Sequence, residues 1–186
     1  VALTALARPG PLVSGMSTEW LKRRTGKELV VSNHPMIGEI LKSTYGIVVY
    51  QEDIMRIARE VGKMSWEDVS QLRKAMSKSM GKEFFDKYKE KFLVGAESQG
   101  FKRDIAEPFW DKMNAFGSWC FNLSHAVAYG YVSYWCMLLK AHYPLQYSAA
   151  CLKHSKGDDQ IIKLLRELYH EGIEYKAFDK DLSLEN

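Results

Sequence analysis

Apolar residues recur at helical spacing through most of the chain. The clearest stripe runs from Tyr50 to Val61, with apolar residues at offsets 0, 4, 7, 8 and 11. Such a stripe predicts an amphipathic helix, and Gly62 stands where its C-cap belongs. Ser65 is expected to cap the next helix, which runs to Ser79, with Asp68 three residues on, close to a capping box. The buried face of that helix is predicted to comprise Trp66, Val69, Leu72 and Met76.

The same spacing, together with Pro, Gly and Asp residues at expected helix ends, predicts further helices. They are expected near residues 18–24, from His34-Pro35 onward, over residues 81–99, from Asp104 to about Ala115 with Pro108 in its first turn, from Ser124 to just before Pro144, from Pro144 to about Lys153, and from Asp158 to Gly172. Inward-facing residues are predicted to be Phe85, Tyr88, Phe92 and Ala96 in one helix and Ile161, Leu164, Leu165, Leu168 and Tyr169 in the last. Residues 46–49 and 173–178 have the character of extended or strand segments. The predicted fold class is therefore mainly α, with at most short β segments.

Composition narrows the class of protein. The 186 residues are 46% hydrophobic and 26% charged, which is typical of a globular chain of one domain or two small ones and excludes a disordered tail, a collagen-like chain and a disulfide scaffold. The longest apolar stretch, residues 126–139, is shorter than the ~20 residues of a membrane span. Three cysteines without paired spacing predict free thiols in a reducing cytoplasm. We expect a cytoplasmic chain with no membrane partner, and, since it starts with Val1, a piece of a longer protein.

Charge is distributed unevenly along the chain. The net charge is +3, but residues 1–103 carry 18 Lys and Arg against 12 Asp and Glu, whereas residues 104–186 carry 8 against 11. An anionic partner is therefore expected on the N-terminal part. Arg73, Lys74 and Lys78 form the most basic helix face there; they are either phosphate ligands or a solvated basic surface. Lys74 and Lys78 are four residues apart, so they repel each other unless an anion binds between them.

The start of the long helix is the second candidate site. A helix N-terminus presents free N–H groups that suit phosphate, and Asn122, Ser124 and His125 add donors; the alternative is a plain N-cap with a packed histidine. The pair Cys120 and His125 lacks an assignable orienting acid, so it is a poor nucleophilic centre. No metal site is predicted: Cys151, His154 and His142 lack the paired ligand spacing of zinc sites. Glu52-Asp53 is interpreted as charge at a helix N-terminus.

Three tyrosines lie in the long helix at positions that cannot all face a core. They are Tyr129, Tyr131 and Tyr134. At least one of them is therefore expected to be available to stack on a base or to line a cleft.

Five motifs occur in one order along the chain. They are Ala7-Arg8-Pro9-Gly10-Pro11-Leu12-Val13-Ser14-Gly15-Met16, Thr44-Tyr45-Gly46-Ile47-Val48-Val49-Tyr50-Gln51-Glu52, Leu72-Arg73-Lys74-Ala75-Met76, Phe121-Asn122-Leu123-Ser124-His125-Ala126 and Leu139-Lys140-Ala141-His142-Tyr143-Pro144. Their order and content resemble the C-family replicative DNA polymerases, the bacterial polymerase III alpha subunits. The resemblance runs from about Val1 to Ser183 and is to the helical fingers region. Residues 1–155 are then the fingers, and residues 156–186 are a C-terminal helix and an extended segment leading to the next region.

The resemblance implies a DNA-directed DNA polymerase, a nucleotidyltransferase, of which this chain is one part. It implies that Arg73 and Lys74 bind the triphosphate of the incoming nucleotide, with Lys78 beside them, and that Asn122, Ser124 and His125 contribute to the nucleotide pocket. Arg8 and Arg24 are implied contacts to DNA or to the palm, and Gln51 is an implied contact to DNA. The implied partners are the primer–template, the deoxynucleoside triphosphate, the rest of the polymerase chain, and a sliding clamp or other replisome subunits.

Three positions depart from the pattern of the family. Lys74 replaces an Arg, which loses the bidentate fork of the guanidinium. Leu123 replaces a Lys, and Trp119-Cys120 replaces Tyr-Gly. These departures indicate a diverged member of the family.

Two-metal phosphoryl transfer needs carboxylates around both ions. The resemblance places those carboxylates, and the Mg²⁺ they bind, in a palm region outside this chain, so no metal, catalytic residue or other cofactor is expected here and the chain alone is predicted to be inactive. Two alternatives are a free-standing helical nucleic-acid-binding protein without catalysis and a hydrolase using Ser124 and His125. The second is poor because adjacent side chains on a helix diverge.

Overall fold

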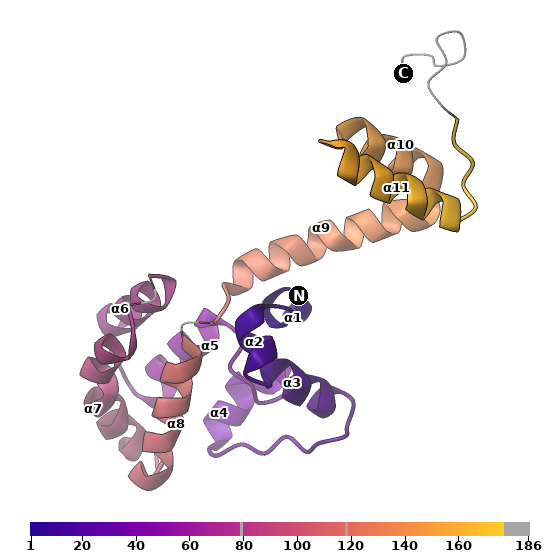
Figure 1. The fold of residues 1–186 in the computed structure, drawn as a ribbon. Helices are drawn as coiled ribbons and strands as arrows, with labels where there is room; N and C mark the ends of the chain where they lie inside the picture. Colours follow the sequence, from indigo (N-terminus) through magenta and orange to yellow (C-terminus); the bar gives the residue numbers. More distant parts are fainter. Residues whose placement is uncertain (79, 118, 177–186) are drawn as a thin grey trace. The chain divides into compact units, whose positions relative to one another are not determined.

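The protein is helical throughout the part that can be described. The computed structural model describes residues 1–78, 80–117 and 119–176. These residues form eleven α-helices, a 3-10 turn at Lys42–Thr44, a π turn at Ile57–Val61 and no strand, which confirms the mainly α prediction (Figure 1). The helices are α1 (Ala2–Leu6), α2 (Pro9–Val13), α3 (Met16–Arg24), α4 (Pro35–Ile40), α5 (Gln51–Arg56), α6 (Trp66–Ser77), α7 (Lys82–Ser98), α8 (Arg103–Gly117), α9 (Leu123–His142), α10 (Pro144–His154) and α11 (Asp158–His170).

The chain divides into two compact units, residues Val1–Gly130 and Tyr131–Asn186. The division falls inside α9 and not near residue 155, where the sequence placed the end of the fingers region; that regional boundary stays a prediction. Ser79, expected at the end of α6, and residues 177–178 of the expected C-terminal extended segment lie outside the described residues. None of the helices within the described residues combines the length and the apolar content that a membrane span requires.

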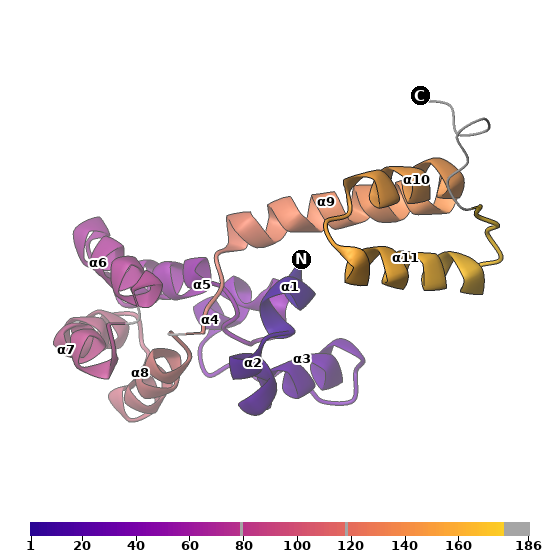
Figure 2. The same ribbon diagram turned by 45° about the horizontal axis from the view of Figure 1, so that its top comes forward.

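The larger core of the first unit lies among α4 to α8. Trp110, Phe92 and Phe101 are its largest fully buried side chains, and Phe92 packs on Trp110 with the ring centroids 4.9 Å apart. Figure 2 shows α6, α7 and α8 side by side around it. The backbone of α7 comes so close to the π turn that a Cβ added to Gly95 would lie 1.8 Å from the carbonyl oxygen of Gly62. Only glycine fits at this crossing.

A smaller core joins the N-terminal helices to the extended segment before α5. Leu6, Met16 and Trp20 are buried there with Val49 and Tyr50. Ala126 of α9 is fully buried in the same cluster, and Leu123 packs against it. The first turn of α9 is therefore fixed on the first unit.

Several local expectations are confirmed. Ser65 caps α6, and its hydroxyl oxygen accepts the N–H of Asp68 at 3.1 Å. Pro35 and Pro144 stand at the first positions of α4 and α10. The predicted stripe from Tyr50 to Val61 is buried, although its second half is a π turn. Residues 47–49 and 173–176 lie in neither a helix nor a strand.

Some expectations about helix starts and buried faces are wrong. Trp66 is 64% exposed, because it is the first residue of α6 and lies beyond the core; the Arg59 guanidinium covers its ring at 5.5 Å. The helix α8 starts at Arg103, so Asp104 lies inside the first turn instead of capping it, and Pro108 falls in the second turn. Gly157, not Asp158, is the N-cap of α11.

The second unit consists of the C-terminal half of α9 with α10 and α11. Leu168 is buried there, whereas Tyr169, expected on the same face, is exposed because the next residue on a helix points about 100° away. The Lys140 ammonium pairs with Glu167 and, at 2.8 Å, with Glu171. These contacts join α9 to α11 within this unit.

Candidate functional site

The first turn of α9 is attached to the segment that leads into α5. The Phe121 N–H donates to the Val49 carbonyl at 3.1 Å, and the Gln51 N–H donates to the Phe121 carbonyl at 3.0 Å. Tyr50 and Phe121 thereby form an isolated parallel bridge. Residues some 70 positions apart are thus held in fixed register at the place where α9 begins.

A carboxylate of α5 caps α9 from outside. Glu52 accepts the backbone N–H of Leu123 at 2.9 Å and the side-chain amide of Asn122 at 3.2 Å. The first N–H groups of a helix have no partner inside the helix, and they form the positive end of its dipole. A carboxylate is therefore stabilising there. The Leu123 N–H, one of the donors of the anion site predicted from the sequence, is therefore already bonded to Glu52.

Asn122, and not Ser124, is the N-cap of α9. Its side-chain oxygen accepts the N–H of His125 at 2.9 Å and the Ser124 hydroxyl at 2.6 Å. The expectation that Ser124 caps this helix is wrong because the bridge at Phe121 starts the helix at Leu123, two residues earlier than a Ser124 cap requires. Ser124 and His125 are exposed in the first turn.

Four side chains form a continuous stack beside this turn. The Arg8 guanidinium lies 4.7 Å from the centre of the Phe121 ring. Phe121 meets His125 edge to face at 5.4 Å, and His125 lies 4.4 Å from Tyr129. Arg8, His125 and Tyr129 are exposed, so the stack presents one cation and two rings to solvent. A cation over an aromatic face can pair with a phosphate, while the exposed rings can stack on a base.

Two titratable groups lie next to the bridge, the buried Asp53 and the half-buried Cys120. Burial raises the pKa of Asp53 to about 6. Two hydrogen bonds to its carboxylate, from the Tyr50 N–H at 2.9 Å and the Val49 N–H at 3.1 Å, oppose this shift and lower the pKa. Glu52 raises the pKa further, and Arg56 lowers it. Burial also raises the pKa of the Cys120 thiol far above its usual range, and the carboxylates of Asp53 and Glu52 add to the effect. Cys120 is therefore a neutral thiol, which further disfavours it as a nucleophile.

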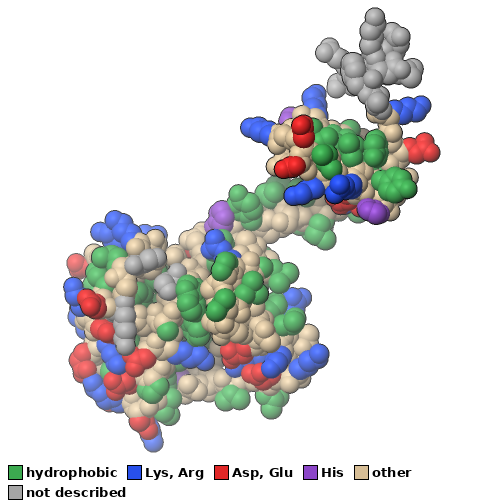
Figure 3. All heavy atoms as spheres, viewed as in Figure 1, with side chains coloured by type: hydrophobic (Ala, Val, Ile, Leu, Met, Phe, Trp, Pro, Cys, Tyr) green, Lys and Arg blue, Asp and Glu red, His purple; other side chains and the backbone are tan. Residues whose placement is uncertain are grey.

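The basic residues of α6 form a separate surface of the first unit. Arg73, Lys74 and Lys78 are exposed, and none of them makes an ion pair with a described residue. Lys and Arg side chains gather over α6 in Figure 3. Lys78 is the C-cap residue, not an interior one, but its N–H still donates to the Lys74 carbonyl at 3.1 Å. The two lysines are therefore one helical turn apart, at the spacing that the sequence predicts.

The structure brings together five of the nine residues predicted for nucleotide or DNA binding. Arg8, Gln51, Asn122, Ser124 and His125 meet around Phe121. Across residues 1–78, 80–117 and 119–176, no hydrogen bond joins them to the α6 cations. Arg24 is apart as well, on α3, with its guanidinium 5.1 Å from the Trp20 ring.

Sequence reasoning missed the two contacts that organise this site. Glu52 was interpreted only as charge at the start of a helix, and Phe121 was given no partner. The Glu52 carboxylate is indeed in the first turn of α5, but it also serves α9. Nothing in the local pattern pairs position 52 with position 123, because that pairing depends on the packing of distant segments.

Comparison with known proteins gives a consistent result. Residues 1–100 match the family described as the bacterial DNA polymerase III alpha subunit finger domain. The DNA polymerase III subunit alpha of Aquifex aeolicus is 38% identical over 174 residues, which is 94% of this chain and 15% of that protein. The subunit of Chlamydia pneumoniae is 40% identical over 176 residues, covering 93% and 14%, and that of Mycobacterium tuberculosis H37Rv is 41% identical over 164 residues, covering 86% and 14%. The chain therefore spans about 15% of the length of these relatives.

Proposed function

The chain belongs to the family of the bacterial DNA polymerase III alpha subunit finger domain, and from this premise we propose that it binds the incoming deoxynucleoside triphosphate and the primer–template for a replicative DNA polymerase. Arg73 and Lys74 bind the triphosphate with Lys78 beside them, and Asn122, Ser124 and His125 contribute to the nucleotide pocket. Arg8, Arg24 and Gln51 contact DNA. The partners are the rest of the polymerase chain and, in the cytoplasm, a sliding clamp or other replisome subunits.

The observation that carries the proposal is the convergence around Phe121. Arg8 comes from the first motif, Gln51 from the second and His125 from the fourth, yet all three adjoin one phenyl ring or its backbone. Three residues from separate motifs that are proposed to bind nucleotide or DNA therefore lie at one place. A purely structural role would not require both an exposed arginine and an exposed histidine against this ring.

The α6 surface supports the triphosphate role by its charge. Arg73, Lys74 and Lys78 are exposed and without carboxylate partners among the described residues. Lys74 and Lys78 repel each other at this spacing, and a bound phosphate replaces that repulsion with charge-assisted hydrogen bonds. Arg73 supplies a planar fork for two phosphate oxygens, whereas Lys74 acts as a point charge.

The contribution of the chain to the reaction is positioning and charge neutralisation. Binding the triphosphate in a fixed orientation removes the entropy cost of alignment, and cations near the phosphates stabilise the charge that develops on transfer. Bound Mg²⁺ would assist the displacement of pyrophosphate. Among the described residues no three His, Cys, Asp or Glu side chains converge as metal ligands. The residues present therefore do not fit a Mg²⁺ pair, and we assign those ions to a palm region and expect the chain alone to be inactive.

DNA binding by the polypeptide of residues 1–186 tests the proposal. We expect a fluorescently labelled primer–template to bind with an affinity that falls as KCl rises, and we expect Arg8→Ala to reduce the slope of log K against log [KCl] by about 1. Arg56→Ala is the matched control, since Arg56 is an exposed arginine whose guanidinium pairs with Glu60 and makes no contact with the Phe121 ring. An identical change in both variants would show only a loss of net charge and would contradict the DNA role of Arg8.

Primer extension tests the assignment of catalysis. The same polypeptide, given Mg²⁺, a primer–template and four deoxynucleoside triphosphates, should extend no primer. Incorporation above a blank without protein would refute the view that the catalytic carboxylates lie elsewhere.

A further inference from the structure

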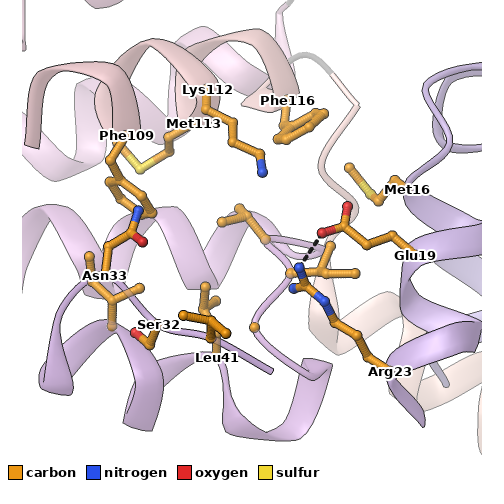
Figure 4. A pocket seen from close by; sticks show the side chains of 15 residues that line it. Met16, Glu19, Arg23, Ser32, Asn33, Leu41, Phe109, Lys112, Met113 and Phe116 are labelled. Carbon is orange, nitrogen blue, oxygen red and sulfur yellow. Dashed lines mark ion pairs between the residues drawn. The ribbon is translucent and has the colours of Figure 1, made fainter. Parts of the chain in front are cut away.

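A cavity of about 210 Å³ lies within the first unit, lined by α3, α8, Ile37 of α4 and the segments 31–33 and 46–48 (Figure 4). None of the residues predicted to bind nucleotide or DNA lines it. The cavity is therefore separate from both candidate surfaces described above.

About half of the cavity wall is apolar. Met16 of α3, Ile37 of α4 and the α8 residues Met113 and Phe116 face the space. In Figure 4, Phe116 and Met16 stand at one end, and Phe109 and Met113 stand at the other. Such a wall releases ordered water when a hydrocarbon ring covers it, which favours a ligand with an apolar body.

The arginine in the wall is already fully used. The Arg23 guanidinium pairs with Glu19, donates to Glu28 at 3.1 Å and donates to the Tyr45 carbonyl at 3.2 Å. It is a structural tie between α3 and its neighbours. A ligand would gain little from this group.

The lysine in the wall is not used in this way. Lys112 extends from α8 into the cavity in Figure 4, and no described carboxylate lies within ion-pair distance of its ammonium. Its closest aromatic neighbour is Phe116, with the ammonium 5.9 Å from the ring centre. The Asn33 side chain, on the opposite wall, forms no hydrogen bond with a described residue. One ammonium and one amide, both on exposed residues, are therefore left for a ligand, and the Glu19 carboxylate in the same wall is held by Arg23.

We propose that this cavity is a binding site for a small organic monoanion, a carboxylate carried on a single ring. The carboxylate pairs with Lys112, the ring covers the wall formed by Met16, Met113 and Phe116, and Asn33 hydrogen-bonds to the ligand's polar end. The volume is below the roughly 300–1,000 Å³ of sites for drug-sized ligands, which limits the occupant to about one ring. Inorganic phosphate would leave the apolar wall uncovered, and a neutral ring would leave Lys112 unpaired.

Methionine methyl resonances provide a direct readout. The polypeptide of residues 1–186, labelled with ¹³C at the methionine methyl groups, is titrated with sodium benzoate as the probe. Met16 and Met113 line the cavity, whereas Met55, Met64 and Met76 do not. We expect saturable shifts of the first two resonances and none of the other three, with each resonance assigned from a Met→Leu variant.

Three comparisons make the test specific. Benzamide, which has the ring without the charge, should bind at least about tenfold more weakly than benzoate, since a charge-assisted hydrogen bond is lost. Lys112→Met should weaken benzoate binding by a similar factor. Lys87→Met is the matched control and should leave binding unchanged, because Lys87 is an exposed lysine on α7 with its ammonium 5.6 Å from the Phe84 ring and outside the cavity.

Several results would overturn the proposal. They are unshifted Met16 and Met113 resonances up to the solubility limit of benzoate, equal binding of benzamide, or unchanged binding by Lys112→Met. Inorganic phosphate that reproduces the same shifts would reduce the site to a general anion contact at Lys112. None of these outcomes depends on DNA or nucleotide binding, so the test is independent of the proposed function.

Discussion

The Glu52 carboxylate accepts the backbone N–H of Leu123 at 2.9 Å, across 71 positions of sequence. This single contact joins the first turn of α5 to the first turn of α9, and the Asn122 amide strengthens it. Because the N–H groups of a helix start are otherwise unpaired, the carboxylate stabilises both the helix and its attachment to the first unit.

Removing this carboxylate should destabilise the protein. Glu52→Ala leaves the Leu123 N–H and the Asn122 amide without their acceptor, and we expect the free energy of unfolding to fall by about 1–3 kcal/mol. Urea denaturation measures it. Glu60→Ala, which removes the exposed partner of Arg56, is the control, with an expected loss below about 1 kcal/mol. Equal losses in the two variants would contradict a special role for Glu52.

Asp53 should give the stability a specific dependence on pH. The pKa of Asp53 is about 6 in the folded protein, whereas the ordinary value, which applies to the unfolded protein, is 3.8. At pH values between these two, the native state binds more protons than the unfolded state. Stability must then fall as pH rises from about 4 to 6, by up to about 3 kcal/mol from this group. Asp53→Asn should lack that part of the slope in urea denaturation measured at several pH values.

A surface carboxylate provides the comparison for the pH experiment. The pKa of Asp68 is lowered by its hydrogen bond with Lys91, and its effect on stability therefore has the opposite sign, being lost as pH falls. Asp68→Asn should keep the wild-type slope between pH 4 and 6. If Asp53→Asn kept that slope too, the assignment to Asp53 would be wrong.

Arg73 should matter for nucleotide use in a polymerase that carries this fingers region. Arg73→Ala removes a proposed phosphate ligand, and we expect kcat/KM for deoxynucleoside triphosphates to fall by about 10–100-fold, the effect of one charge-assisted hydrogen bond. Arg73→Lys should lie between, because the ammonium keeps the charge but not the fork. Arg56→Ala should be close to wild type in the same assay. Unchanged kinetics for Arg73→Ala would contradict the proposal that Arg73 binds the triphosphate.

Leu123 tests how the start of α9 faces its ligand. Leu123 packs against the smaller core, but a lysine stem can cover the same apolar surface while its ammonium reaches solvent. We therefore expect Leu123→Lys to fold and to bind deoxynucleoside triphosphate more tightly, by severalfold in a titration of intrinsic tryptophan fluorescence. Leu123→Met controls for the change in packing. Equal affinity of the two variants would show that position 123 does not face the nucleotide.

The sequence by itself determined the helices and the family. Apolar spacing, the Ser65 cap and the prolines at helix starts act within four residues, so α3, α6, α7 and α10 could be located from local physics alone. Errors arose near the starts of helices. Trp66 was expected to be buried but is exposed at the first position of α6, and Pro108 falls one turn deeper in α8 than expected.

Only the tertiary structure decided how the candidate site is assembled. The bridge between Tyr50 and Phe121 fixes where α9 begins, and that in turn makes Asn122 its cap and gives Glu52 its second partner. The same packing stacks Arg8 on Phe121 and leaves Lys112 without an ion-pair partner among the described residues. Hydrogen bonds between segments 70 residues apart depend on how two cores pack, and a pattern that repeats every 3.6 residues carries no information about that packing.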